Sequence, residues 1–197
     1  MSGGPGSVPG TMDLADVLLA SWDRQVRIID AIATRVTEET RGVLPSPDGW
    51  PLDRHLAHIH NVRNGWLQEV APTREVLPTI FQSNGDGSLV LDEEGTRPAA
   101  LEEIKRLLEL SAQAVRDTIA AALPNGDMPF GPYDHAVHFL GHMVWHEGWH
   151  AGLIFTGLRL AGHEPTEEWE EEHVWSLWRF GRSIPWDQQP GNLPAPS

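Results

Sequence analysis

Apolar residues recur at spacings of three and four along four long stretches of the chain, at positions 13–41, 50–71, 98–123 and 133–161. This spacing matches the 3.6-residue period of a helix with one apolar face. A shorter stretch, 164–183, begins with glutamates and ends with arginines, which suits the dipole of a fifth helix. The pattern therefore predicts an all-α fold with essentially no sheet.

The connections predict how these helices are arranged. About 25 residues separate the second and third stretches, which is long for neighbouring antiparallel helices and long enough to cross a bundle from end to end. Four long helices with one long crossover describe a four-helix bundle. The termini are rich in glycine and proline, so we expect flexible tails at 1–11 and 184–197 around one domain at 12–183.

Composition narrows the possible functions. The 197 residues carry a net charge of −14 and include no cysteine. Cysteine nucleophiles and thiolate metal sites are excluded, and so acidic a surface argues against nucleic-acid binding. The N-terminal residues lack the features of a signal peptide, and no apolar run is long enough to span a membrane. We expect a cytoplasmic protein with a small-molecule substrate.

Histidines dominate the fourth stretch, where they follow one another at four-residue intervals. His138, His142, His146 and His150 form this ladder, and each is rotated by only about 40° from the one before it. From Ala136 to Leu158 the only charged residue besides the histidines is Glu147, so most of this helix should be buried. Buried imidazoles need partners, and one metal ion can satisfy several of them at once.

The second stretch contains another histidine cluster, formed by His55, His58 and His60. Two helices could thus bring three imidazoles together, with His146 and His150 as the best pair. Spacing alone leaves the third ligand open between His55 and His58. His142, one turn before His146, could orient a ligand or carry protons, although an ordinary histidine at the edge of the core is the simpler interpretation.

Glu147 lies about 100° around the helix from His146. We therefore expect this carboxylate to face solvent or a neighbouring helix, and not to act as a general base. Nine tryptophans are many for this length and should mostly form core or groove walls.

Two segments carry a family resemblance. The sequence HLAHIHNVRNGWLQEV, followed much later by MVWHEGWHAGLIFTGLRLAG, resembles the DinB/YfiT-like family of metal-dependent bundles over residues 12–162. The family pattern places one metal-binding histidine in the second helix, matching His58, and an HxxxH pair in the fourth, matching His146 and His150. Members often have glutamine three residues after the last histidine, where this chain has Leu153.

The resemblance implies more than a ligand set. It implies helices that run up-down-down-up and a divalent metal, zinc or nickel, with open coordination positions. Some members are transferases or isomerases that use low-molecular-weight thiols. We therefore expect a metal-dependent transferase or hydrolase that uses such a thiol; the alternative is a stress-related, non-catalytic bundle in which the metal is structural. The family and the many tryptophans also favour a homodimer.

Overall fold

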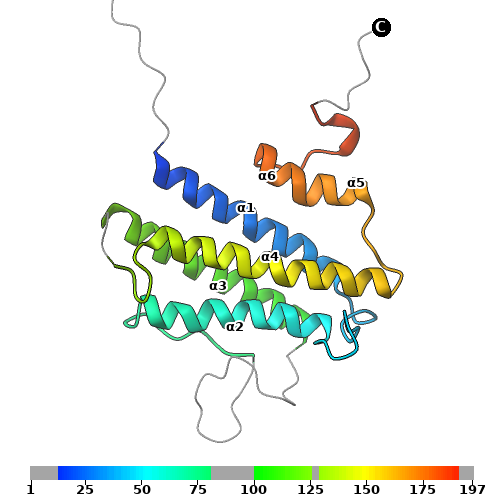
Figure 1. Cartoon of the computed structure of the whole chain (residues 1–197), viewed down its shortest axis with the longest axis horizontal. Helices are drawn as coiled ribbons and strands as arrows, with labels where there is room; N and C mark the ends of the chain where they lie inside the picture. The colour runs from blue at the N-terminus through cyan, green and yellow to red at the C-terminus, as the bar shows by residue number, and fades with distance from the viewer. Residues whose placement is uncertain (1–12, 81–99, 126–128, 191–197) are drawn as a thin grey trace, which may run out of the picture.

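The computed structural model describes residues 13–80, 100–125 and 129–190 of the chain. Four long helices make up the bundle: α1 (Leu14–Arg35), α2 (Leu52–Val70), α3 (Leu101–Ala122) and α4 (Ala136–Leu160) (Figure 1). The shorter elements are η1 (Leu123–Asn125), α5 (Glu167–Glu170), η2 (Glu171–Trp175), α6 (Ser176–Phe180) and η3 (Trp186–Gln188). The described residues contain no strand, so the predicted all-α class is confirmed.

The helices run up, down, down and up, as the resemblance implied. In Figure 1, α2 and α3 point the same way, while α1 and α4 point the opposite way. Hydrogen bonds agree with this arrangement. Arg63 in α2 donates to the carbonyl of Leu108 in α3, and Arg74, just past α2, donates to the hydroxyl of Thr118 near the end of α3. Parallel neighbouring helices need a long crossover connection, of which residues 81–99 lie outside the described part.

Among the helix boundaries that differ from the predicted ones, two are explained by local turns. The first helix stops at Arg35 instead of continuing to about residue 41, because turns follow in which the hydroxyl of Thr40 accepts the backbone N–H of Thr37. The fourth helix begins at Ala136 and not at Tyr133, because a backbone-paired turn precedes it and the ring of His135 accepts the N–H of Val137 as a cap.

The C-terminal segment continues the bundle further than the sequence suggested. The predicted fifth helix is present as α5 and α6, joined without a break by the π-helical turn η2. In Figure 1 this segment lies against α1. The tail was expected from residue 184, but Ile184 and Gln189 are buried, and the amide of Gln189 donates to the carbonyl of Ile184. These contacts fold the chain through η3 to residue 190.

A charged pair lies inside the bundle. Arg63 in α2 and Glu147 in α4 are each 1% exposed, and Nε of Arg63 lies 2.7 Å from a carboxylate oxygen of Glu147. Gln25 in α1 donates to the other carboxylate oxygen at 3.1 Å. Glu147 therefore does not face solvent; it faces the neighbouring helices and joins α1, α2 and α4 through hydrogen bonds.

None of the described helices is both long enough and apolar enough to cross a membrane.

Candidate functional site

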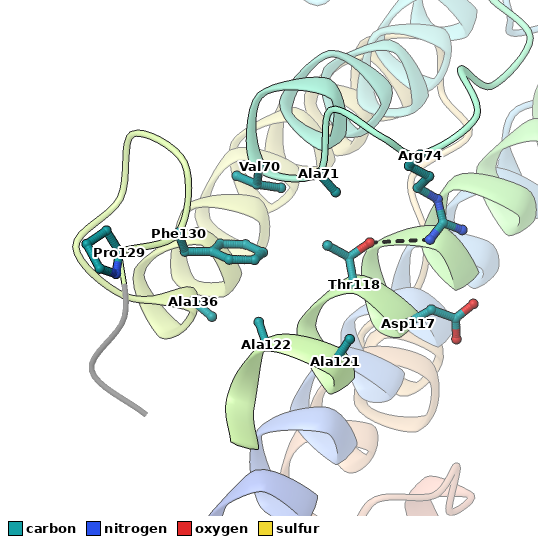
Figure 2. Close-up of a pocket in the computed structure, with 10 residues that line it drawn as sticks. All are labelled: Val70, Ala71, Arg74, Asp117, Thr118, Ala121, Ala122, Pro129, Phe130 and Ala136. Atoms are coloured by element: carbon teal, nitrogen blue, oxygen red, sulfur yellow. Dashed lines mark hydrogen bonds between the residues drawn. The ribbon is translucent and has the colours of Figure 1, made fainter. Parts of the chain in front are cut away.

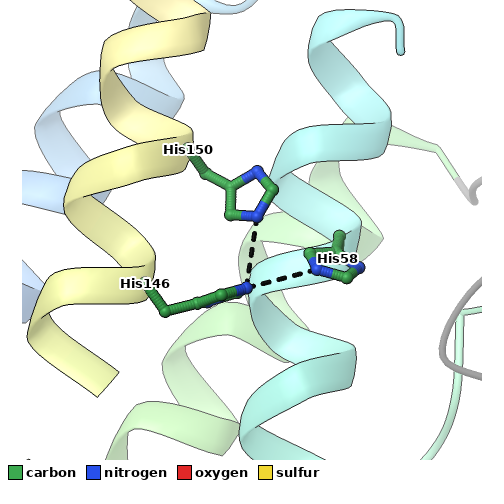
Figure 3. Close-up of side chains that lie close together, drawn as sticks. All are labelled: His58, His146 and His150. Atoms are coloured by element: carbon green, nitrogen blue, oxygen red, sulfur yellow. Dashed lines mark hydrogen bonds between the residues drawn. The ribbon is translucent and has the colours of Figure 1, made fainter. Parts of the chain in front are cut away.

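Three histidines from two helices, α2 and α4, meet at one point. Figure 3 shows His58 on α2 facing His146 and His150 on α4. Nε2 of His146 lies 3.2 Å from Nε2 of His58 and 3.2 Å from Nε2 of His150. All three residues offer a ring nitrogen within 4.8 Å of the other two. The structure thus brings together the three residues that the family pattern indicated.

Hydrogen bonds alone cannot satisfy this arrangement. A neutral imidazole nitrogen carries either one hydrogen or one lone pair in the ring plane, so Nε2 of His146 cannot bond well to two neighbours at once. A shared cation removes the conflict. Nitrogens bound at about 2.1 Å to one ion lie about 3.0 Å apart at a right angle and about 3.4 Å apart at a tetrahedral angle. The observed 3.2 Å falls between these values.

Burial keeps two of these imidazoles neutral. Desolvation lowers the pKa of His146 to about 4, with further contributions from His58, His142 and Arg63. Desolvation likewise lowers the pKa of His150 to about 3, assisted by the neighbouring imidazoles. Both rings therefore carry lone pairs at neutral pH. Neutral imidazole is the form that binds zinc or nickel, so the site favours metal over protons.

His55 is also part of the cluster, but on the other side of His150. Its Nδ1 lies 2.9 Å from Nδ1 of His150, while Nε2 of His150 points towards His146. A metal-binding histidine usually donates its second ring nitrogen to a fixed acceptor, which sets the tautomer and the direction of the lone pair. The alternative between His55 and His58 thus separates into two positions: His58 at the nitrogen cluster and His55 behind His150.

Replacing His55 by phenylalanine is expected to weaken metal binding by about 10–100-fold without abolishing it, because His150 loses the acceptor that orients its ring. Phenylalanine keeps a ring of similar size in this buried position. Competition for zinc against a chelator measures the change. His163→Ala is the control, since the His163 side chain is 42% exposed and lies outside the cluster. An unchanged affinity in His55→Phe would remove this role.

An aromatic residue before α2 covers the cluster. The ring of Trp50 stacks on His150, with centroids 6.4 Å apart, and meets His58 edge-on at 5.0 Å. The preceding turn fixes its position. A Cβ on Gly49 would lie 2.7 Å from Oγ of Ser46 and 3.2 Å from its backbone, so a larger residue there would disturb the turn.

A hollow of about 290 Å³ opens beside Trp50 and reaches His150. Its far wall is formed by Trp149 and Leu153 of α4, and residues of the turn before α2 form the rim. Leu153, which stands where the family often has glutamine, thus gives the hollow an apolar wall next to the histidines. A small molecule placed here would lie against His55 and His150.

On the other side of His146, a second histidine has a fixed partner. The ring of His142 lies edge-on to that of His146, and the hydroxyl of Tyr133 lies 2.7 Å from its Nδ1. Burial raises the pKa of Tyr133, so its hydroxyl keeps its proton at neutral pH. The ring of Trp66 packs against those of Tyr133 and His142. The sequence did not indicate this role for Tyr133, because the residue lies in a turn and belongs to no repeating pattern.

The remaining histidines lie apart from the cluster. His60 is buried, and its ring nitrogens contact the carbonyl oxygens of Leu107 and Pro78, so it fastens α2 to its neighbours. The side chain of His138 is 61% exposed beside Asp134. His163 and His173 also lie outside the site. Within the four-residue ladder, the rings of His142, His146 and His150 therefore contact one another in succession, whereas His138 lies outside the cluster.

The three histidines that converge from the second and fourth helices of this all-helical bundle form a group that could hold a metal ion. The sequence profile of the DinB family matches residues 11–168, which include all four long helices and the whole histidine cluster. The chain therefore belongs to the DinB family. No curated protein and no solved structure matched the sequence significantly.

Proposed function

We propose that this protein is a metal-dependent enzyme that acts on a small molecule, with one divalent ion held by His58, His146 and His150. The convergence of their three ring nitrogens carries this proposal. The donor set fits zinc or nickel, both of which bind imidazole. Three protein ligands leave room for an exogenous ligand, which is typical of catalytic sites.

When bound, the ion would act as a Lewis acid that makes water or a low-molecular-weight thiol nucleophilic at neutral pH. The chain has no cysteine, so a thiol must come from solution. Trp50 packs against His150 and His58, and the hollow lined by Trp149 and Leu153 provides a place for the substrate beside the cluster. His142, held by the hydroxyl of Tyr133, is placed to take or give a proton next to His146.

The alternative is a bundle in which the metal only joins helices. One observation indicates that the bundle does not need a metal ion to hold α2 and α4 together. The buried pair of Arg63 and Glu147 already joins α2 to α4, the two helices that carry the histidines. A structural ion would duplicate this connection, whereas an exchangeable ion beside a hollow serves chemistry. The homodimer and the cytoplasmic location stay predictions.

Cobalt-substituted protein offers a direct test, because the absorption spectrum of cobalt reports its ligands. We expect cysteine or glutathione to produce a saturable thiolate-to-metal absorption band, because a coordination position is open. The same titration in His142→Gln should keep the metal and the band, while any turnover that is found should fall by about 100-fold or more if His142 carries protons. A spectrum that neither thiols nor anions change would contradict an open coordination position and favour a metal that only joins helices.

A further inference from the structure

A second cavity, of about 390 Å³, lies where α2 and α3 end and α4 begins (Figure 2). It shares no lining residue with the histidine cluster or with the hollow beside it. Ala136, at its edge, stands ten positions before His146, which is about 15 Å along a helix. The cavity is therefore a site of its own.

Small side chains leave this space open. Ala121 and Ala122 of α3 and Ala136 of α4 line it, together with Val70 at the end of α2. In Figure 2 the ring of Phe130 projects from the loop into the gap between these helices. The walls are thus somewhat more apolar than polar, and the volume lies within the range of about 300–1,000 Å³ typical of small-molecule sites.

The aromatic wall is held in place before any ligand arrives. The backbone of Phe130 pairs with that of Tyr133 through two hydrogen bonds of 2.8 and 3.1 Å. Gly131, between them, has a φ of 59°, and a Cβ there would lie 2.9 Å from the carbonyl oxygen of Glu69. The turn is therefore pressed against the end of α2. A preformed wall lowers the ordering cost of binding.

One corner of the cavity is cationic. The guanidinium of Arg74 donates to the hydroxyl of Thr118 at 3.4 Å, a long bond to a neutral partner (Figure 2). Within the described residues Arg74 forms no ion pair, although the chain has 28 acidic and 14 basic residues. Carboxylates pair with six other arginines: Arg41, Arg63, Arg106, Arg116, Arg159 and Arg179. Arg74 thus keeps donors for an anion.

The charges around the corner limit that anion. Asp117 also lines the cavity and accepts a hydrogen bond from Gln113. Its carboxylate, added to a net charge of −14, disfavours ligands with several negative charges. A single carboxylate can instead receive two parallel bonds from a guanidinium. We propose that the cavity binds a small monocarboxylate with an apolar body, anchored on Arg74 and packed against Phe130 and Val70.

Two-dimensional NMR of the full chain can test this site with phenylpropanoate as the probe. Saturable shifts are expected at the amides of Thr118, Ala122 and Phe130 and not at those of His146 and His150. Phenylpropanol, which has the same body without the charge, should bind at least about tenfold more weakly, because hydrogen bonds to charged groups contribute more. Equal binding of the alcohol, or tighter binding of inorganic phosphate, would contradict the proposal.

Variants separate charge recognition from a general loss of structure. Arg74→Gln should weaken phenylpropanoate binding by at least about tenfold and leave phenylpropanol unchanged. Ala122→Phe fills the cavity and should weaken both probes. Arg159→Gln, which removes an exposed arginine paired with Glu164 at the far end of α4, should change neither. Undiminished carboxylate binding in Arg74→Gln would overturn the assignment.

Discussion

Replacing His146 by alanine is expected to lower zinc affinity by more than about 100-fold, because the loss of a ligand should exceed the usual 10–100-fold effect of losing a supporting partner. His146 is the central member of the cluster, with its Nε2 atom 3.2 Å from both of the others. His58→Ala and His150→Ala should behave alike. Equilibrium dialysis followed by elemental analysis gives the occupancy.

Stability gives an independent readout of the same change. At a free zinc concentration about 100 times the dissociation constant, the metal should stabilise the unaltered protein by about 2.7 kcal/mol and these variants by almost nothing. His138→Ala is the matched control on the same helix, since its side chain is 61% exposed and pairs with Asp134. Full zinc stabilisation in His146→Ala would contradict the proposed ligand set.

Glu147→Ala should destabilise the metal-free protein by about 3–5 kcal/mol, because it leaves the buried Arg63 guanidinium without its charged partner. Both side chains are 1% exposed, so water cannot replace the lost bonds. Chemical denaturation of the metal-free protein measures the difference. Glu102→Ala provides the comparison, since its exposed pair with Lys105 should contribute less than about 1 kcal/mol.

A double replacement tests the reason for that loss. In Arg63→Met with Glu147→Met, no charge remains buried, so much of the stability should return. A Glu147→Ala variant that loses less than about 1 kcal/mol would mean that the pair is not isolated from water. A double variant less stable than Glu147→Ala would show that Arg63 matters chiefly through its bonds to Leu108 and Ser111.

The all-α fold could be predicted from the sequence because each long helix buries one face, and a buried face requires apolar residues at spacings of three and four. It was less informative where tertiary contacts decide. Leu14–Arg35 and Ala136–Leu160 begin or end at turns stabilised by side-chain and backbone bonds that periodicity does not record. The burial of Glu147 had a signal, namely a lone charge in an apolar helix, but its partner Arg63 is 84 residues away.

The candidate site shows the same division. Four-residue spacing placed His146 and His150 on one face of a helix, whereas the choice between His55 and His58 depends on how α2 is rotated against α4. That rotation is a property of packing, not of spacing. Trp50 and Tyr133 lie in turns, where their directions follow from neighbouring segments. Residues of this kind can be found only once the elements are placed.

Zinc K-edge X-ray absorption of the zinc-loaded protein tests the central claim most directly. Three histidines and an exchangeable ligand predict a shell of nitrogen and oxygen atoms at about 2.0–2.1 Å, with the multiple-scattering pattern of three imidazole rings. In His58→Ala the pattern should shrink or the zinc should be lost, while His163→Ala should match the unaltered protein. A zinc shell dominated by carboxylates, or one identical in His58→Ala, would contradict a metal centre built on His58, His146 and His150.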